Sequence, residues 1–434
     1  MSARKAGGAV PTQTSEHPMD RHFARNAAGI SSSELIWGLG MPAVFESTFI
    51  PIFMRGLGAS SLLVGLAPTL LSAGVALAAF SAWSLTARRR RKKGPLIAVH
   101  MIAAFPILCF GLFLLLTGIR PSTLAVFLAA YATSSLAIGL LLPVWQNYTT
   151  KIFSDRMRVR AIGIMTLAQS AARFTGAFLL LRIVERFAVS ATGAALVFTS
   201  VGALFVAGSL PYLFTVEESG PESPAPALVP HHSSVRGLFV NRSFLSFMAT
   251  EVEYVALGSV IAFYANYATE YCGVGPAAAS GLFAMLSSLG GMAANAAFGW
   301  ADLGSLRVKF VLTKSLALAG ILLMAFHSAP WVFLLVSALL GISRGTRAVV
   351  YAPAVKRLAG ADDATPYFAV APILLLPLSL GLPLASGAFL DATVRLGAWS
   401  YRIAFLAMAL FSGVGLYFST RIQAGAGRPS TGES

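Results

Sequence analysis

Long apolar stretches recur along the whole of this 434-residue chain, separated by short polar segments. A hydrocarbon core about 30 Å thick needs about 20 helical residues per crossing, because each residue of a helix rises about 1.5 Å. Charged residues make up 11% of the composition, whereas a soluble domain carries about a quarter. The sequence therefore predicts an all-α integral membrane protein. We expect its twelve transmembrane helices at about 29–54, 61–84, 95–117, 122–146, 160–182, 189–214, 243–268, 277–300, 308–328, 330–352, 366–390 and 400–419.

Lysine and arginine fill alternate gaps between these stretches. On one side lie 22 basic residues, including the run from Arg88 to Lys93, and on the other side lie six. The positive-inside rule places the side with 22 in the cytoplasm, together with both termini. The formal net charge of +15 is then explained by loops that contact anionic headgroups, not by a nucleic-acid surface. We expect a bacterial inner or plasma membrane, with the lipid bilayer as a partner and no nucleic acid.

The longest internal polar gap, about 217–241, is rich in Pro, Ser, Ala and Glu, a composition that does not form a packed core. We interpret it as a cytoplasmic linker that divides the apolar stretches six and six. The predicted organisation is a cytoplasmic N-terminal tail at 1–28, an N-terminal six-helix bundle at 29–216, the linker at 217–241, a C-terminal six-helix bundle at 242–420 and a cytoplasmic C-terminal tail at 421–434.

A shift of 216 positions aligns the second apolar stretch with the eighth without gaps. Identical residues then coincide along one helical face, and basic residues coincide beyond the ends of both stretches. The matched pairs are Gly65 with Gly281, Leu66 with Leu282, Leu70 with Leu286, Gly74 with Gly290, Ala78 with Ala294, Arg91 with Arg307 and Lys93 with Lys309. Small residues on such a face let helices approach closely in lipid. The alignment indicates an internal duplication.

Two sets of six helices, internal termini and a central linker resemble the major facilitator superfamily. A signature loop of that family, Gly-x-x-x-Asp-x-x-Gly followed by basic residues, has a shortened counterpart here in Gly299, Asp302, Gly304 and Arg307. In the first half Thr86 stands where the loop would carry its acidic residue.

The resemblance covers about residues 26–420, including Pro143-Val144-Trp145 and the basic residues after it. It implies two pseudo-symmetric six-helix halves that enclose a substrate cavity near the midplane. The first, fourth, seventh and tenth helices would line this cavity, and the loop at Gly299, Asp302, Gly304 and Arg307 would act in gating.

Carboxylates inside the predicted spans are the candidates for proton coupling. An ionisable side chain at the bilayer centre costs about 2.5–3.5 kcal/mol, so that its presence there needs a reason. Glu46 lies in the first span, and Glu251 and Glu253 lie in the seventh. Each could carry a proton between the two sides, or Glu46 could pair structurally with Arg173 of the fifth span. Glu251 and Glu253 lie about 200° apart on a helix, so that both cannot face the cavity.

Arg344 and Arg347 lie three residues apart in the tenth span and share a helical face. They could form a cationic patch that binds a carboxylate or phosphate on the substrate, or they could extend to the cytoplasmic headgroups. Lys314, near the inner end of the ninth span, is expected to extend to the headgroups, and Glu34 is expected at the interface.

Further polar and aromatic residues could line the cavity, although amides in bundles also bond between helices and aromatic residues also pack. Together with Arg173, Arg344 and Arg347, the substrate-cavity candidates are Gln146, Gln169, Trp37, Tyr254 and Tyr264. Pro42 and Pro51 predict a bend in the first span.

These patterns predict a secondary active transporter that moves a small solute by alternating access, with protons as the driving ion. We expect no enzymatic activity, no cofactor, no metal site and a monomer. A phosphate-binding loop for ATP is absent from the sequence. Two alternatives stay open, a polytopic membrane enzyme acting on lipid and a nontransporting scaffold or sensor with the same fold. Proteoliposome uptake would separate transport from both alternatives.

Overall fold

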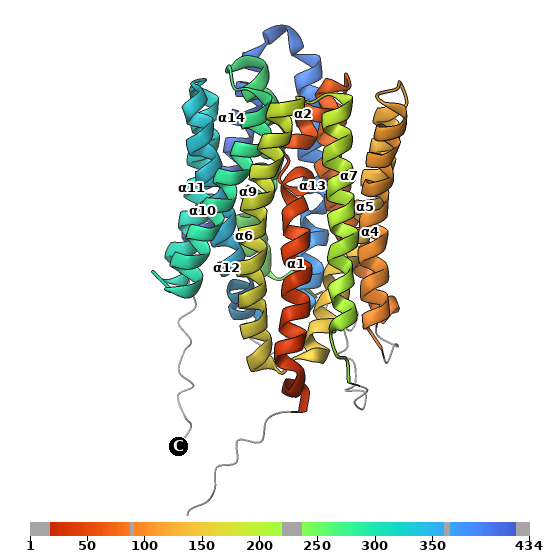
Figure 1. The fold of residues 1–434 in the computed structure, drawn as a ribbon. Coiled ribbons are helices and arrows are strands. Elements are labelled where there is room, and N and C mark those ends of the chain that lie inside the picture. The colour runs from red at the N-terminus through yellow and green to blue at the C-terminus, as the bar shows by residue number, and fades with distance from the viewer. Residues whose placement is uncertain (1–17, 87–90, 219–236, 360–364, 422–434) are drawn as a thin grey trace, which may run out of the picture.

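The computed structural model describes residues 18–86, 91–218, 237–359 and 365–421. Its helices run side by side along one axis (Figure 1). In the first half they are η1 (Pro18–His22), α1 (Phe23–Phe45), α2 (Phe49–Gly56), α3 (Ser61–Thr86), α4 (Lys93–Thr117), α5 (Thr123–Ile152), α6 (Asp155–Phe187), α7 (Ala191–Ser209) and η2 (Leu210–Phe214). In the second half they are α9 (Arg242–Tyr271), η3 (Ala278–Leu282), α10 (Phe283–Ala294), η4 (Asn295–Trp300), α11 (Leu306–Phe326), α12 (Pro330–Ala359), α13 (Thr365–Ala392), η5 (Val394–Leu396) and α14 (Ala398–Arg421).

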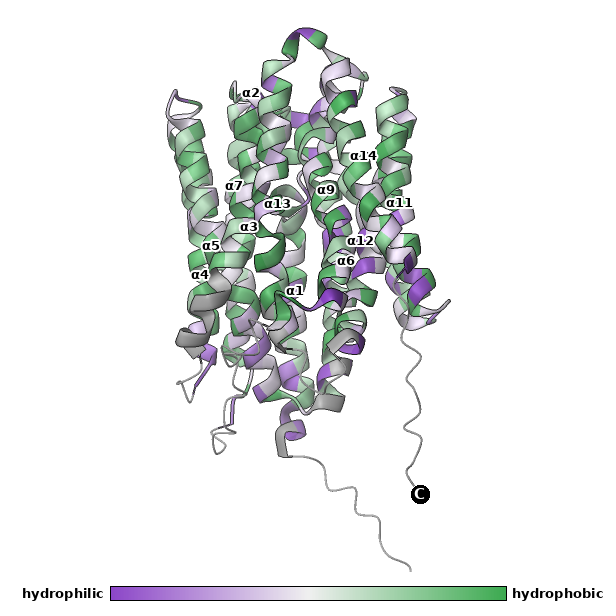
Figure 2. Cartoon of the chain, turned by 180° about the vertical axis from the view of Figure 1, so that it is seen from behind, coloured by the Kyte–Doolittle hydropathy of each residue, from purple (hydrophilic) through white to green (hydrophobic). Residues whose placement is uncertain are grey.

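The fold is that of an all-α multi-pass membrane protein, as the sequence predicts. Within the described residues, ten helices are long and apolar enough to cross a membrane, or eleven if the bent pair α1–α2 is one span. A shorter apolar helix at Ser61–Leu77 belongs to α3. The described part of the chain therefore does not fix the count of twelve, although a helix lies at each predicted span. Figure 2 shows apolar residues along the helices and hydrophilic residues at their lower ends and beside α9 and α12.

The first predicted span is a broken helix instead of a continuous one. α1 and α2 meet at an angle of 46°. The three residues between them, 46–48, are not helical, and Ser47 has a φ of 53°, in the left-handed region. Pro42 within α1 removes a backbone donor, whereas Pro51 lies in the first turn of α2, where the helix needs no donor. The break therefore falls between the two prolines and leaves Glu46 at the end of α1.

The two halves touch near the end of the bundle opposite to the described chain ends, at the top of Figure 1. Arg55 of α2 forms an ion pair with Glu270 of α9, with 2.8 Å between Nε and Oε1. Asp391 of α13 accepts hydrogen bonds from the backbone N–H groups of Ser61 and Leu62 at the start of α3, at 2.7 and 2.9 Å. A carboxylate from one half thus caps a helix of the other half.

The glycines matched by the 216-residue shift make equivalent contacts. Gly65 of α3 leaves no room for a Cβ against the backbone of α13, and Gly281 of η3 leaves none against the backbone of α6. Nine residues further on, about two and a half turns, Gly74 packs in the same way against α5, and Gly290 packs against α12. In the predicted order of spans, α13 is the second-half counterpart of α6, and α12 is the counterpart of α5. Each matched pair of glycines therefore packs against corresponding helices, so that the repeat preserves the same close contacts in both halves.

The first linker residue, Glu217, is packed against the N-terminal bundle. Its carboxylate accepts hydrogen bonds from the backbone N–H groups of Lys92 and Lys93, at 2.7 and 3.0 Å, and forms an ion pair with Lys151 at 2.8 Å. Partial burial alone would raise the pKa of Glu217, but these hydrogen bonds outweigh it and lower the pKa. Glu217 thus caps α4, which has no side-chain cap of its own. Residues 219–236 of the linker and Arg88–Arg90 lie outside the described residues.

Candidate functional site

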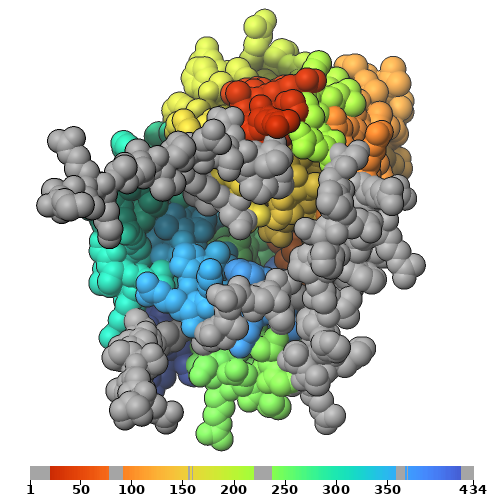
Figure 3. All heavy atoms as spheres, turned by 90° about the horizontal axis from the view of Figure 1, so that it is seen from below, coloured from red at the N-terminus to blue at the C-terminus, as the bar shows by residue number. Residues whose placement is uncertain are grey.

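A cavity of about 290 Å³ lies between the two halves. The residues from α6 that line it, such as Gln169 and Arg173, and those from α12, such as Arg344 and Arg347, come from the parts of these helices away from the closed end. Ligand pockets typically measure about 300–1,000 Å³, so that this cavity suits a small solute. Seen from the end that carries the described chain ends, the surface is hollowed between the yellow residues of the first half and the blue residues of the second (Figure 3).

Glu46 is shared by two arginines from opposite halves. Its Oε2 lies 2.5 Å from Nη1 of Arg344 on α12, and its Oε1 lies 3.7 Å from Nη1 of Arg173 on α6. The Glu46 side chain is 5% exposed, whereas those of Arg344 and Arg173 are 30% and 33% exposed. The pair with Arg173 matches the structural alternative from the sequence, but Arg344 is the nearer partner. The two arginines therefore present cationic surface to the cavity, which Glu46 also lines.

Glu34 lies twelve residues before Glu46, just over three helical turns, and also faces the bundle interior. Its Oε2 accepts a hydrogen bond of 2.5 Å from Nε2 of Gln169, which lines the cavity. Glu34 therefore has a partner on a neighbouring helix, and its depth at the membrane interface stays a prediction. Glu34 and Gln169 come within hydrogen-bond distance because α1 packs closely along α6. At Gly176 of α6 there is no room for a Cβ against the backbone of Leu39 on α1.

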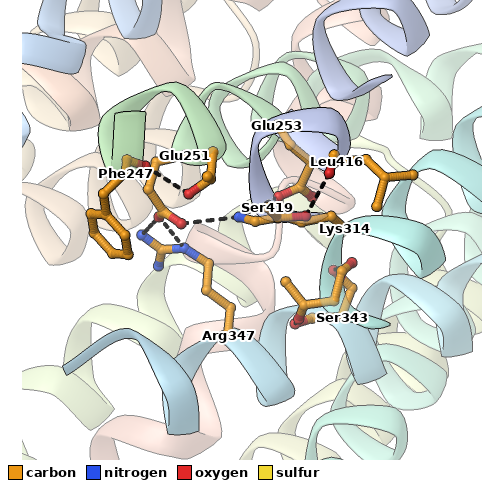
Figure 4. A network of polar contacts seen from close by, with 10 residues as sticks. Phe247, Glu251, Glu253, Lys314, Ser343, Arg347, Leu416 and Ser419 are labelled. Atoms are coloured by element: carbon orange, nitrogen blue, oxygen red, sulfur yellow. Dashed lines mark hydrogen bonds and ion pairs between the residues drawn. The ribbon is translucent and has the colours of Figure 1, made fainter. Parts of the chain in front are cut away.

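A second ionic cluster lies within the second half (Figure 4). Nζ of Lys314 on α11 lies 3.0 Å from Oε1 of Glu251 and 2.8 Å from Oε2 of Glu253, both on α9. Oε2 of Glu251 also accepts hydrogen bonds from Arg347 of α12, at 2.6 Å from Nη2 and 2.8 Å from Nε. The Lys314 side chain is fully buried. The expectation that Lys314 reaches the headgroups is therefore wrong, because two carboxylates hold its ammonium group inside the bundle.

The two carboxylates of this cluster differ in their partners. Glu251 accepts hydrogen bonds from both Lys314 and Arg347, whereas among the described residues Glu253 forms an ion pair with Lys314 alone. Neither residue lines the cavity. Two carboxylates and two cations balance each other in charge, which is the condition under which buried ionic groups are tolerated.

Arg347 connects this cluster to the cavity. Its guanidinium carbon lies 3.6 Å from the ring centre of Tyr254 and 4.6 Å from that of Tyr351. Arg344 and Arg347 both line the cavity, and each pairs with a glutamate inside the bundle. The alternative in which they extend to the headgroups is therefore wrong. Tyr254 also lines the cavity, as does Gln169.

The remaining sequence candidates lie elsewhere. Trp37 is buried and stacks on Phe205, with 4.2 Å between ring centres. Tyr264 is buried and lines a chamber of about 10 Å³ beside Glu46. Gln146 is exposed on α5 and is not among the residues that line the cavity. The cavity also has small hydroxyl side chains that the sequence analysis missed, since nothing distinguishes them from helix-packing residues; these are Thr166, Ser170, Ser287 and Ser288.

The loop at Gly299–Arg307 is held within the second half. Asp302 adopts a φ of 48° and forms an ion pair with Lys309, which lowers the pKa of the Asp302 carboxyl. Gly304 has a φ of 78°, which glycine adopts without strain. Arg307 donates a hydrogen bond of 2.7 Å to the carbonyl oxygen of Thr420 at the end of α14. The loop thus ties η4, α11 and α14 together in this conformation. Over the described ranges, no three His, Cys, Asp or Glu side chains gather to hold a metal ion.

Comparisons with known proteins agree with this architecture. The model of the Major Facilitator Superfamily matches residues 39–371. No curated protein sequence matches the chain. Among solved structures, a bacterial homologue of the human lysosomal transporter Spinster, in an inward-facing and unoccupied conformation, has a TM-score of 0.63 and 15% identity, covering 93% of this chain and 96% of the other.

Two further solved structures are similar. A bacterial homologue of the human drug peptide transporters PepT1 and PepT2 has a TM-score of 0.67 and 13% identity, covering 91% of this chain and 98% of the other. A mutant of the nucleoside transporter NupG has a TM-score of 0.67 and 12% identity, covering 92% and 100%. At these identities the similarity shows a shared fold and does not identify a substrate for this chain.

Proposed function

Because the chain belongs to the Major Facilitator Superfamily, we propose that this multi-pass membrane transporter moves a small solute by alternating access and is driven by protons through Glu46. One observation carries the proposal. A buried carboxylate at a helix break binds an arginine of the other half beside a cavity between the halves. Protonation of Glu46 would therefore weaken an ion pair that joins the two halves.

Alternating access is supported by where the halves touch and where they do not. Near one end, contacts such as Arg55–Glu270 and Asp391 with the start of α3 close the bundle. Towards the other end the halves enclose the cavity. With the orientation expected from the basic loops, the cavity faces the cytoplasm, as in an inward-facing transporter of the bacterial inner membrane. Rocking of one half against the other would open the closed end.

Proton coupling is supported by the charge arrangement around Glu46. Uptake of a proton would neutralise the carboxylate and leave Arg344 without its ionic partner across the interface. Because water still reaches the 30% exposed Arg344, the loss of this pair is worth about 1 kcal/mol, which changes the ratio of the two conformations about fivefold. Glu251 and Glu253 are the next candidates for proton binding, and of the two Glu253 has fewer ion pairs among the described residues.

The test needs no knowledge of the substrate. Ala348 is an exposed residue that lines the cavity, and Ala348→Cys in a background with Cys109 and Cys272 replaced by serine reports its accessibility. A membrane-impermeant thiol reagent is applied from each face of oriented vesicles at pH 6 and pH 8. We expect labelling to move towards the closed face at pH 6, and Glu46→Gln to show the pH 6 pattern at both pH values.

Glu185→Gln is the matched control, because Glu185 pairs with Arg182 on an exposed part of α6. It should keep the wild-type response. If labelling of the wild type does not depend on pH, the proposal that protons drive the conformational change is refuted. If Glu46→Gln responds to pH like the wild type, Glu46 is not the residue that binds the proton. The scaffold alternative predicts that Ala348→Cys is never accessible from the closed face.

A further inference from the structure

The two arginines at Glu46 have donors that the protein does not use. A guanidinium group has five N–H donors. Arg344 directs Nη1 to Glu46, whereas Arg173 contacts Glu46 at 3.7 Å, beyond hydrogen-bond distance, and directs Nε at the sulfur of Met41 at 3.2 Å. Both side chains are about one third exposed, and both line the cavity. The cavity wall therefore offers cationic donors from both halves to a ligand.

The charges around Glu46 balance when every group is ionised. On α1 are Glu34 and Glu46, and opposite them are Arg173 on α6 and Arg344 on α12, so that two negative charges face two positive charges. Among the described residues, the other titratable groups that face this set are Tyr254 and Tyr264 of α9 and Tyr212 of η2, which are neutral phenols. Within the described residues, the cluster of Glu251, Glu253, Lys314 and Arg347 is also balanced.

One proton on Glu46 therefore leaves the cavity with one uncompensated positive charge. An anion with a single charge restores the balance, and a planar carboxylate matches the fork of a guanidinium group in geometry. A cation would instead compete with the proton for Glu46 and would meet two arginines in the cavity wall. The volume of about 290 Å³ equals the space of about ten water molecules in the liquid.

We propose that the cavity binds a small monocarboxylate between Arg173 and Arg344, together with the proton on Glu46, so that one anion and one proton cross in the same step. This inference rests on the proposed coupling at Glu46 and adds the class of substrate and the stoichiometry. Binding of the two ligands is cooperative, since the proton frees the arginines and the anion neutralises them. Transport is electroneutral, so that a pH gradient drives it and a membrane potential does not.

The binding test uses the purified full chain in detergent and a set of small monocarboxylates, each with its neutral amide, and inorganic phosphate as a second oxyanion. Thermal stabilisation is measured at pH 6 and pH 8. We expect at least one carboxylate to bind, its amide to bind more than tenfold more weakly, and its affinity to fall about tenfold or more from pH 6 to pH 8. Stabilisation by phosphate alone would overturn the assignment to carboxylates.

Variants separate this inference from the proposed coupling. In Glu46→Gln the carboxylate should bind equally at both pH values, whereas Arg344→Gln should weaken binding tenfold or more; Arg182→Gln, at an exposed pair, should leave it unchanged. Carboxylate binding without pH dependence in the wild type overturns the link to the proton but keeps the anion site. Equal binding of amides, or stabilisation by no carboxylate of the set, overturns the substrate class. The accessibility of Ala348→Cys then still decides the coupling.

Discussion

The ion pair of Glu46 and Arg344 makes an asymmetric prediction for two single variants. The carboxylate is 5% exposed and the guanidinium group is 30% exposed, so that the two charges lose unequal amounts of hydration in the folded protein. Arg344→Gln leaves a buried carboxylate whose remaining partner, Arg173, lies at 3.7 Å. Glu46→Gln leaves an arginine that water still reaches. We therefore expect Arg344→Gln to be the more destabilising change.

The magnitude follows from the distance and the burial. Two unit charges about 4 Å apart interact by about 4 kcal/mol at an effective dielectric constant of about 20. Partial exposure of the arginine reduces this, so that we expect a loss of about 3 kcal/mol in Arg344→Gln and about 1 kcal/mol in Glu46→Gln. In the double variant both charges are absent, and the loss should be about 2 kcal/mol smaller than the sum of the single losses.

The assay is equilibrium unfolding in mixed micelles titrated with a denaturing detergent, for the wild type, both single variants and the double variant. A parallel cycle with the exposed pair of Arg182 and Glu185 should give a coupling of less than about 1 kcal/mol. Additive losses at Glu46 and Arg344, or a larger loss in Glu46→Gln than in Arg344→Gln, would refute the reasoning from burial.

Three further outcomes are expected. Asp391→Ala removes the carboxylate that caps α3 across the closed end, so that labelling of Ala348→Cys from that end should rise several-fold, whereas an unchanged rate would show that the cap does not hold the closed end. Lys314→Met leaves two buried carboxylates with one cation and should lose about 3 kcal/mol or more in the same unfolding assay, and a loss below about 1 kcal/mol would contradict the charge balance. Glu217→Gln weakens the cap of α4 and should cost about 1 kcal/mol at pH 7. Because the folded-state pKa of Glu217 is lowered, this difference should be complete above the unfolded-state pKa of about 4.3 and disappear as the pH falls through the folded-state pKa; a difference that grows on acidification would reverse the sign.

Hydropathy and charge predicted the fold because a lipid bilayer constrains the patterns of apolar and basic residues along the sequence. A span must be long and apolar, and basic loops collect on one side, so that positions of helices can be assigned from the sequence alone. The matched glycines at Gly65 and Gly281 also carried structural information, since close packing leaves no alternative to glycine there. The break at Glu46 was predicted only as a bend, because two prolines indicate lost hydrogen bonds and do not say whether the helix unwinds between them.

Partners across the bundle could not be predicted in the same way. Glu46 and Arg344 are 298 positions apart, and a sequence gives the depth of each residue but not the rotation of its helix or the identity of its neighbour. Lys314 shows the same limit. Its position near a predicted span end favoured the headgroups, but α11 begins at Leu306 and brings the ammonium group to two glutamates of α9. Charged residues inside a membrane protein therefore identify candidates, and only the packing of helices identifies pairs.

Uptake into proteoliposomes tests the central claim most directly, with a carboxylate that stabilises the purified protein as the solute. An inward-directed proton gradient is imposed with and without a potassium diffusion potential, for the wild type and Glu46→Gln. We expect the proton gradient to accelerate wild-type uptake, the potential to have no effect, and Glu46→Gln to exchange solute without any response to the gradient. Gradient-driven accumulation by Glu46→Gln at the wild-type rate would contradict the claim.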